Sequence, residues 1–200
     1  MIVKVCGINK SENYNAIVNL GVDMIGINFY KPSSRYINDI VLPVKKDEIR
    51  IGVYVKATMG ELRQSIDQYD IDVLQLHGDE SIEYCKEAQQ IRPIIKVWRV
   101  DQDFKWDILD GYSFADAFLF DTKTIDYGGS GHQFDWSFLS NYMMEIPFLL
   151  SGGIGPDDTI KINELNHPMF KGVDINSRFE EEPGIKKVDA VASFIKQLRK

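Results

Sequence analysis

The sequence lacks several features that would assign it to common functional classes. It has no run of basic residues, and its net charge is −7, with 23 basic against 30 acidic residues. Nucleic-acid-binding domains need a clustered basic patch, so that class is disfavoured. No apolar run approaches the roughly 18 residues of a membrane span, and the N-terminus lacks the basic and apolar regions of a secretory signal. We therefore expect neither a nucleic acid nor a membrane as a partner.

Cysteine and histidine are also scarce. Cys6 and Cys85 lie far apart, which predicts neither a disulfide framework nor a Cys-x-x-Cys metal site. The three histidines, His77, His132 and His167, do not belong to a cluster with zinc-like spacing. The sequence therefore predicts no metal site, and a reducing, cytoplasmic location suits its two thiols.

What the sequence does contain is a repeated alternation of short apolar runs and helical patterns. Two hundred residues are enough for one domain with a substantial core, and we assign residues 1–200 to a single domain. The apolar runs are nearly continuous, which is typical of strands buried on both faces of a parallel sheet. There are eight of them, at 2–6, 24–29, 50–55, 72–77, 93–98, 116–121, 147–152 and 172–176.

Helical patterns lie between most of these runs. Ser11 is expected to cap the first helix, and Pro156 is expected to open a later one. The clearest patterns cover 11–21, 60–70, 155–165 and a C-terminal segment with one apolar face made of Val188, Val191, Ile195 and Leu198. The weakest connection follows the second run, because residues 42–48 allow only a short helix or a turn.

Eight strands that alternate with helices predict an α/β protein, a compact (β/α)8 TIM barrel. A doubly wound open sheet is the alternative. That fold more commonly has about five or six strands, and no Gly-x-Gly-x-x-Gly follows the first run. In a barrel, chemistry takes place at the carboxyl ends of the strands. The residues at those ends are therefore the candidate site.

Two strand ends carry groups suited to proton transfer. Period-two alternation directs Val3 and Val5 outward to the helices and Lys4 and Cys6 inward. The same alternation directs Asp121 inward at the end of the sixth run. Either residue alone is as easily a packed thiol or a helix-capping acid, but the two at matched height favour a catalytic pair. Lys4 either lowers the pKa of Cys6 by its positive charge or lies too deep in the barrel to do so.

Glycines and small polar residues follow the last two runs. Gly152 and Gly153 come after the seventh run, and Asn176 and Ser177 lie at the end of the eighth. Loops at these positions commonly hold a phosphate in barrels, with backbone N–H groups as donors. We expect a phosphate here, although the two glycines alone would be an ordinary tight turn.

Three further features complete this ring of strand ends. Arg35, in the loop 30–37, presents a planar fork suited to a carboxylate, although a lone loop arginine is more often solvated. His77 ends the fourth run and either lines the pocket or makes a structural hydrogen bond. The long Gly-rich loop 122–134 is expected to be a mobile lid over the substrate.

Seven stretches, in order and nearly from end to end, match the pattern of one enzyme family. They are KVCGI (4–8), GINFYKPSSRYI (26–37), LQLHGDE (74–80), FLFDT (118–122), GGSGHQFDW (128–136), LSGGIGPDD (150–158) and GVDINSRFEEEPGIKK (172–187). On these stretches the chain resembles phosphoribosylanthranilate isomerase, a (β/α)8 enzyme of tryptophan biosynthesis.

The resemblance implies an Amadori rearrangement of N-(5′-phosphoribosyl)anthranilate to 1-(2-carboxyphenylamino)-1-deoxyribulose 5-phosphate, with no metal or organic cofactor. It implies that Cys6 is the general base, Asp121 the general acid and Arg35 the ligand of the anthranilate carboxylate. The other residues expected to bind this small phosphosugar are His77, Gly152, Gly153, Asp174, Asn176 and Ser177. We expect a monomer or a homodimer.

Two positions depart from the family pattern, and rival interpretations stay open. Lys56 stands where an asparagine is common, and Arg178 stands where a small residue is usual. One rival is another phosphosugar barrel, such as indole-glycerol-phosphate synthase or a histidine-pathway isomerase. The latter would be expected to have an aspartate in place of Cys6. A catalytically silent binding barrel is the other rival, but it would not need an acid–base pair.

Overall fold

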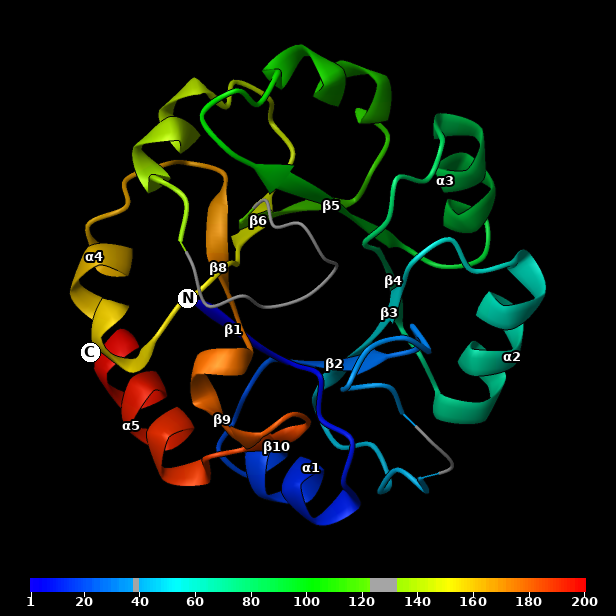
Figure 1. The fold of residues 1–200 in the computed structure, drawn as a ribbon, viewed down its shortest axis with the longest axis vertical. Helices are drawn as coiled ribbons and strands as arrows, with labels where there is room; N and C mark the ends of the chain where they lie inside the picture. Colours follow the sequence, from blue (N-terminus) through cyan, green and yellow to red (C-terminus); the bar gives the residue numbers. More distant parts are fainter. Residues whose placement is uncertain (38–39, 123–132) are drawn as a thin grey trace.

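Eight parallel strands form a closed barrel in sequence order, as the computed structural model, which describes residues 1–37, 40–122 and 133–200, shows (Figure 1). β1 pairs with both β2 and β8, which closes the ring. The predicted (β/α)8 barrel is therefore confirmed, and the open sheet is excluded. The strands are β1 (Ile2–Cys6), β2 (Met24–Asn28), β3 (Ile49–Tyr54), β4 (Val73–Leu76), β5 (Ile94–Val100), β6 (Ala117–Thr122), β7 (Phe148–Leu150) and β8 (Phe170–Ile175).

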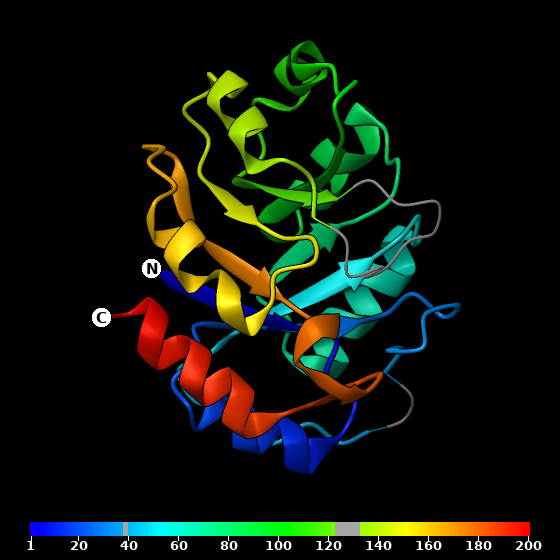
Figure 2. The ribbon, with the colours of Figure 1, turned by 60° about the vertical axis from the view of Figure 1, so that its left-hand side comes forward.

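Helices and 3-10 turns surround the barrel (Figure 2). The α-helices are α1 (Ser11–Val18), α2 (Met59–Tyr69), α3 (Ile82–Gln89), α4 (Thr159–Asn163) and α5 (Val188–Leu198). The 3-10 turns are η1 (Trp106–Tyr112), η2 (Trp136–Asn141), η3 (Pro156–Asp158) and η4 (Ser177–Phe179). In the described part of the chain, none of these helices has the length and apolar character needed to cross a membrane.

The helix termini follow local side-chain chemistry. Thr58 and Glu61 form a reciprocal capping box that begins α2. Pro156 opens η3 as predicted, because its missing N–H is not needed at a first helical position. The assignment of Ser11 as an N-cap is wrong. Lys10 is the capping residue, and the Ser11 hydroxyl instead donates to the carbonyl of Val41 at 2.6 Å.

The connection from β2 to β3 contains no helix in its described parts, 29–37 and 40–48. Of the two alternatives for 42–48, the short helix is therefore not formed. The segment is fixed instead by polar contacts to strand β3 and helix α1. The Pro43 carbonyl accepts from Arg50 at 2.5 Å, and the Glu48 carboxylate accepts from the Tyr14 hydroxyl at 2.7 Å.

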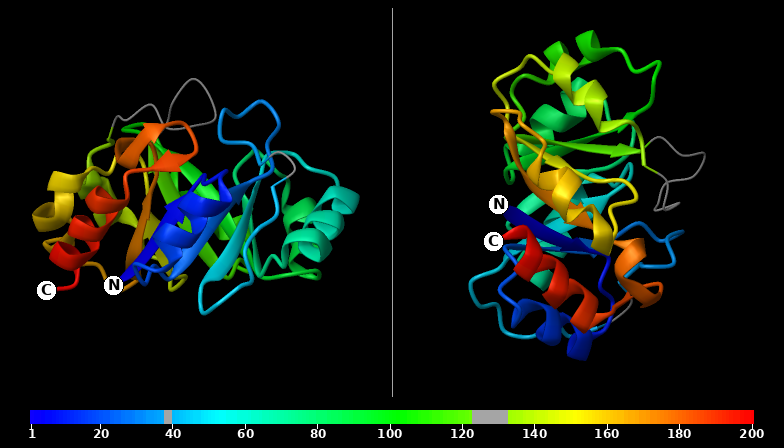
Figure 3. Two further views of the ribbon diagram at one scale, coloured as in Figure 1. Left: turned by 90° about the horizontal axis from the view of Figure 1, so that it is seen from below. Right: turned by 90° about the vertical axis from the view of Figure 1, so that its left-hand side faces the viewer.

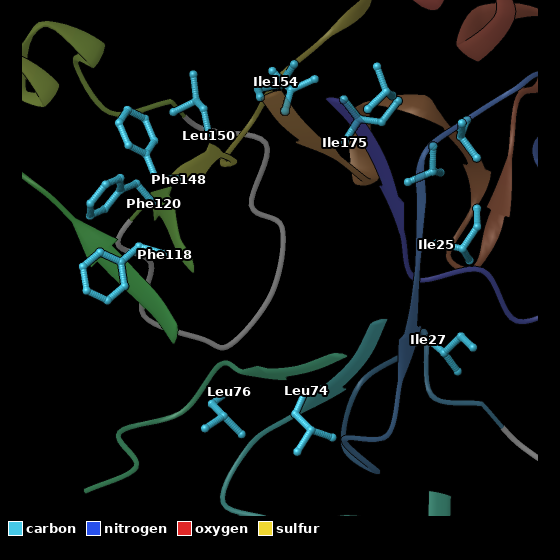
Figure 4. Packing of buried hydrophobic residues seen from close by; sticks show 14 of the residues in the cluster. Ile25, Ile27, Leu74, Leu76, Phe118, Phe120, Phe148, Leu150, Ile154 and Ile175 are labelled. Carbon is cyan, nitrogen blue, oxygen red and sulfur yellow. The ribbon is translucent and has the colours of Figure 1, made fainter. Parts of the chain in front are cut away.

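The apolar side chains form two layers. Those between the strands and the helices point outward from the ring of strands, and they include Phe118, Phe120 and Leu150 (Figure 4). A smaller cluster fills the barrel interior and consists of Ile51, Ile95, Val97, Leu119 and Leu149. The outward Phe118 and Phe120 and the inward Leu119 follow the predicted alternation. Each fully buried side chain of this kind contributes about 1.5–3 kcal/mol.

A hairpin that the sequence did not predict follows η4. Its strands are β9 (Glu180–Glu182) and β10 (Ile185–Lys186). Asn13 of α1 donates to the carbonyl of Lys186 at 2.9 Å and accepts from its N–H at 2.8 Å. The hairpin is thereby fixed to α1. It lies at the end of the barrel where the strands have their carboxyl ends, and both termini lie at the opposite end (Figure 3).

Candidate active site

The carboxyl ends of the strands surround a cavity of about 70 Å³. All nine residues that the sequence analysis assigned to catalysis or substrate binding line it: Cys6, Arg35, His77, Asp121, Gly152, Gly153, Asp174, Asn176 and Ser177. The sequence did not point to the rest of the lining, which consists of Asn28, Tyr30, Ser33, Val53, Val55, Ser151 and Ile154. Asn28 had a usable signal, since it is a polar residue one position before the end of the second apolar run, and it is the last residue of β2.

Cys6 is the last residue of β1, and its side chain is buried. Gly7 follows it with a left-handed backbone at φ +76°, which favours glycine. A Cβ atom on Gly7 would lie only 2.7 Å from Cδ of Arg35. The glycine after the thiol therefore makes room for the arginine as it crosses the end of β1.

Two cations influence the Cys6 thiol from opposite ends of the chain. Burial is the larger influence and raises the pKa of Cys6 above its ordinary value, while Lys4 and Lys186 oppose that shift. Lys4 therefore acts on this pKa in the expected direction, but desolvation outweighs its attraction and the pKa is raised overall. Lys4 itself is fully buried, and its ammonium lies 2.9 Å from a carboxylate oxygen of Asp174.

Asp121 lies on β6, and its side chain reaches His77, which follows β4, two strands away in the ring. Its Oδ1 accepts from the N–H of Thr122 at 2.8 Å, and its Oδ2 lies 3.4 Å from Nε2 of His77. The other ring nitrogen of His77 lies 3.2 Å from Nε2 of Gln75. Both sequence-based alternatives for His77 are thus realised, since it lines the cavity and also links Asp121 to Gln75.

The loop after β7 packs against the end of β6. Gly152 has φ +90°, and a Cβ atom there would lie 2.2 Å from the hydroxyl oxygen of Thr122. A glycine is therefore required at this position by packing beside Asp121. Arg178, which follows the neighbouring strand β8, is exposed and lies against this loop, since a Cβ atom on Gly155 would be 3.2 Å from its Nε.

Arg35 is not a solvated loop charge. Its Nε and Nη2 donate to the carboxylate of Glu180, with Nε 2.9 Å from Oε1 and Nη2 2.6 Å from Oε2. Lys186 donates to the same carboxylate at 2.6 Å and to Oδ1 of Asn176 at 2.6 Å. Sequence reasoning missed Glu180 and Lys186, because three consecutive acids before a turn are more often a solvated surface run.

A larger cavity of about 460 Å³ lies beside the first, between the loop after β2 and helix α2. The two cavities share Tyr30 and Val55 as a common wall. Lys56 lines the larger one, and its backbone N–H donates to Glu80 at 3.0 Å. None of the residues singled out from the sequence as catalytic lines it. The predicted lid, 122–134, and His132 fall largely or wholly on residues 123–132, outside the described residues.

A closed (β/α)8 barrel with these side chains gathered at its carboxyl end defines the chain as a TIM-barrel enzyme. The model of the N-(5′-phosphoribosyl)anthranilate (PRA) isomerase family matches residues 3–197. The chain belongs to this family.

Individual relatives agree with this membership. An N-(5′-phosphoribosyl)anthranilate isomerase of Parabacteroides distasonis is 39% identical over 208 residues, covering 99% of this chain and 93% of the relative. The crystal structure of the Thermotoga maritima isomerase has a TM-score of 0.87 at 32% identity, covering 100% of this chain and 99% of that one. A third relative was solved in complex with reduced 1-(o-carboxyphenylamino)-1-deoxyribulose 5-phosphate, with a TM-score of 0.83, 29% identity and coverage of 100% and 99%.

Proposed function

We propose that Cys6 and Asp121 are the general base and the general acid with which this chain, in tryptophan biosynthesis, isomerises N-(5′-phosphoribosyl)anthranilate to 1-(2-carboxyphenylamino)-1-deoxyribulose 5-phosphate. One observation carries these assignments. The thiol of β1 and the carboxyl of β6 line a single cavity, which also holds Arg35 and the loops after β7 and β8. The substrate has a phosphate at one end and a carboxylate at the other. In this cavity the loops after β7 and β8 are available to the phosphate, Arg35 to the carboxylate, and the thiol and carboxyl groups to the reacting carbons between them.

The first step opens the ribose ring. Asp121, as the carboxylic acid, donates its proton to the ring oxygen while the C1′–O bond breaks. The lone pair of the anilino nitrogen forms the new C1′=N bond, which leaves a protonated imine. This imine is an electron sink within the substrate, so the reaction calls for no metal and no organic cofactor.

The second step moves a proton from C2′. The thiolate of Cys6 removes it, and the electron pair of the C2′–H bond forms the C1′=C2′ bond and neutralises the imine nitrogen. The enolamine becomes the ketone when C1′ gains a proton and the C2′ hydroxyl loses one. In the reactive state, Cys6 is therefore a thiolate and Asp121 is a protonated carboxylic acid.

Positive charge near Cys6 has to favour the thiolate in this state. Burial of the thiol works in the opposite direction, and Lys4 and Lys186 are the cations that oppose it. Lys4 is held by its ion pair with Asp174, so its charge is fixed in place below the cavity wall. We assign Asp174 to the substrate-binding set on its position in the lining, together with His77.

The two ends of the substrate are assigned to different residues of the cavity lining. The loops with Gly152, Gly153, Asn176 and Ser177 are the proposed phosphate site, because they present backbone groups of two adjacent strand ends. Arg35 is the proposed ligand of the anthranilate carboxylate. Both anions are bound by local donors, which is compatible with a net charge of −7 for the whole chain.

The test of the acid–base pair is turnover, followed through the loss of substrate fluorescence. Cys6→Ser and Asp121→Asn should each lower kcat by roughly 10²–10⁴-fold, the usual contribution of a general acid or base. Asp121→Asn should leave KM nearly unchanged. Cys85→Ala is the matched control, since this buried thiol lies on α3 away from the cavity, and its kcat should stay near normal. Retention of more than about a tenth of kcat by Cys6→Ser would remove Cys6 from the role of base.

We also propose that the chain works in the cytoplasm as a monomer or homodimer. Its two cysteines are free and buried, which suits a reducing compartment. Light scattering of the purified chain at several concentrations would separate the two oligomeric states, and cell fractionation would test the location.

A further inference from the structure

Arg35 meets Glu180 along only one of its two donor edges. A guanidinium has a side edge made by Nε and one hydrogen of Nη2, and an end edge made by Nη1 and the other hydrogen of Nη2. The contacts to Glu180, at 2.9 Å and 2.6 Å, use the side edge. The end edge is the neighbouring pair of N–H donors, which shares Nη2 with the side edge, and it has the two-point geometry that a second carboxylate needs.

Glu180 is surrounded by N–H donors and is almost completely buried, with 5% of its side chain exposed. Besides Arg35, it accepts from the Lys186 ammonium at 2.6 Å and from the N–H of Gly184 at 3.1 Å. Burial alone would raise the pKa of Glu180, but Arg35 and Lys186 hold it below its ordinary value. The carboxylate is therefore a fixed negative charge with fixed geometry.

The cluster of Arg35, Glu180 and Lys186 also has the charge that a carboxylate ligand requires. With Arg35 and Glu180 alone, the pair would be neutral. The Lys186 side chain is fully buried and adds a second cation, so the three charges sum to one positive. Lys186 also donates to Asn176, and Asn13 of α1 binds both of its backbone polar groups. The positive charge of Lys186 is therefore held in place by the contact between the β9–β10 hairpin and α1.

We infer that Glu180 is a positioning residue for substrate recognition: it fixes the side edge of Arg35 so that the end edge faces the anthranilate carboxylate. Neither Glu180 nor Lys186 lines the cavity, so Glu180 acts on the substrate through Arg35. This inference rests on the proposed role of Arg35. According to this inference, the β9–β10 hairpin contributes to substrate specificity by orienting Arg35, which lies 145 positions before Glu180 in the chain.

The decisive comparison is between two substrates, N-(5′-phosphoribosyl)anthranilate and the aniline counterpart that lacks the carboxylate. Glu180→Gln keeps the shape of the side chain but replaces one acceptor by an NH2 group, which faces donors from Arg35 and Lys186. We expect KM for the carboxylated substrate to rise about tenfold, equivalent to about 1.4 kcal/mol, while kcat stays within about twofold. The KM of the aniline counterpart should not change. Glu181→Gln, an exposed neighbour, is the control and should behave as the wild type.

Arg35→Ala, measured beside these variants, separates the two ways in which the idea can fail. If Arg35→Ala keeps the full preference for the carboxylated substrate, then the proposed role of Arg35 is wrong. If Arg35→Ala loses the preference and Glu180→Gln retains it, only the positioning role of Glu180 is overturned. If Glu180→Gln weakens both substrates equally, the residue is merely structural and the inference also fails.

Discussion

The thiol of Cys6 is buried at the end of a strand, and its protonation should follow from that position. Because burial raises the pKa of Cys6, the thiol stays protonated to a higher pH than an exposed cysteine, and its reactivity should rise as the pH rises. In the Cys85→Ala protein, we expect the rate of alkylation by iodoacetamide to have its midpoint above the value of roughly 8.5 for free cysteine. A midpoint at or below that value would contradict the dominance of burial.

A second variant isolates the opposing cation. Lys186 lowers the pKa of Cys6, so in Lys186→Met the alkylation midpoint should move to still higher pH.

The raised pKa of Cys6 also makes the stability of the fold depend on pH. A raised pKa in the folded state favours the protonated thiol, so the contribution of Cys6 to folding is present below the unfolded pKa and is lost as the pH rises through the folded one.

Residues at strand ends were predictable because strand geometry alone fixes where they point. Cys6 and Asp121 follow from period-two alternation in a barrel strand. Glu180 does not follow from any local pattern. Its burial depends on a hairpin of three and two residues that packs on α1, which lies far away in the sequence. The net direction of the shift in the Cys6 pKa could not be predicted from the sequence either, because it depends on how completely the closed barrel excludes water.

Among the elements, the turn between β4 and α3 depends on a buried ion pair. The Glu80 carboxylate accepts from the N–H groups of Gly78 and Lys56, each at 3.0 Å, and from the Lys96 ammonium at 3.1 Å. Both charged side chains are almost completely buried. A buried charge without its partner is costly, so this turn, which follows His77 directly, depends on Lys96.

Lys96→Met should therefore lower the free energy of unfolding by about 3–5 kcal/mol, measured by urea denaturation, because it leaves Glu80 buried and unpaired. The double variant Lys96→Met/Glu80→Gln should recover part of that loss. Arg199→Met breaks an exposed pair with Asp23 and is the matched control, with an expected loss of no more than about 1 kcal/mol. Equal losses in the two single variants would show that the burial of Glu80 does not matter.

The strands could be located from the sequence more closely than the elements between them. Continuous apolar runs mark a strand buried on both faces, and β1 spans the predicted 2–6 without change. The 3-10 turns η1 and η2 have no comparable period, so nothing predicted them. The start of α1 was misread because Ser11 makes a tertiary hydrogen bond to Val41 instead of a local cap.

At the scale of the molecule, the ends of the chain meet in the barrel wall. β1 pairs with β8 through Lys4 and Asp174, and the ion pair between these two residues spans 170 positions. Contacts of such long range form late, because the entropy of a large loop has to be overcome first. The cavity takes Cys6 from the first strand and Ser177 from just beyond the last, so it cannot be complete before these strands join.

During refolding from urea, secondary structure and enzymatic activity should therefore recover at different times. Far-ultraviolet circular dichroism, which reports helices, should recover before enzymatic turnover, since chains of this length commonly fold through intermediates. Simultaneous recovery of both signals would show that the ring closes as fast as its helices form. A cell that makes this enzyme would then hold, for the duration of that lag, newly made chains that are already compact and helical but have no activity.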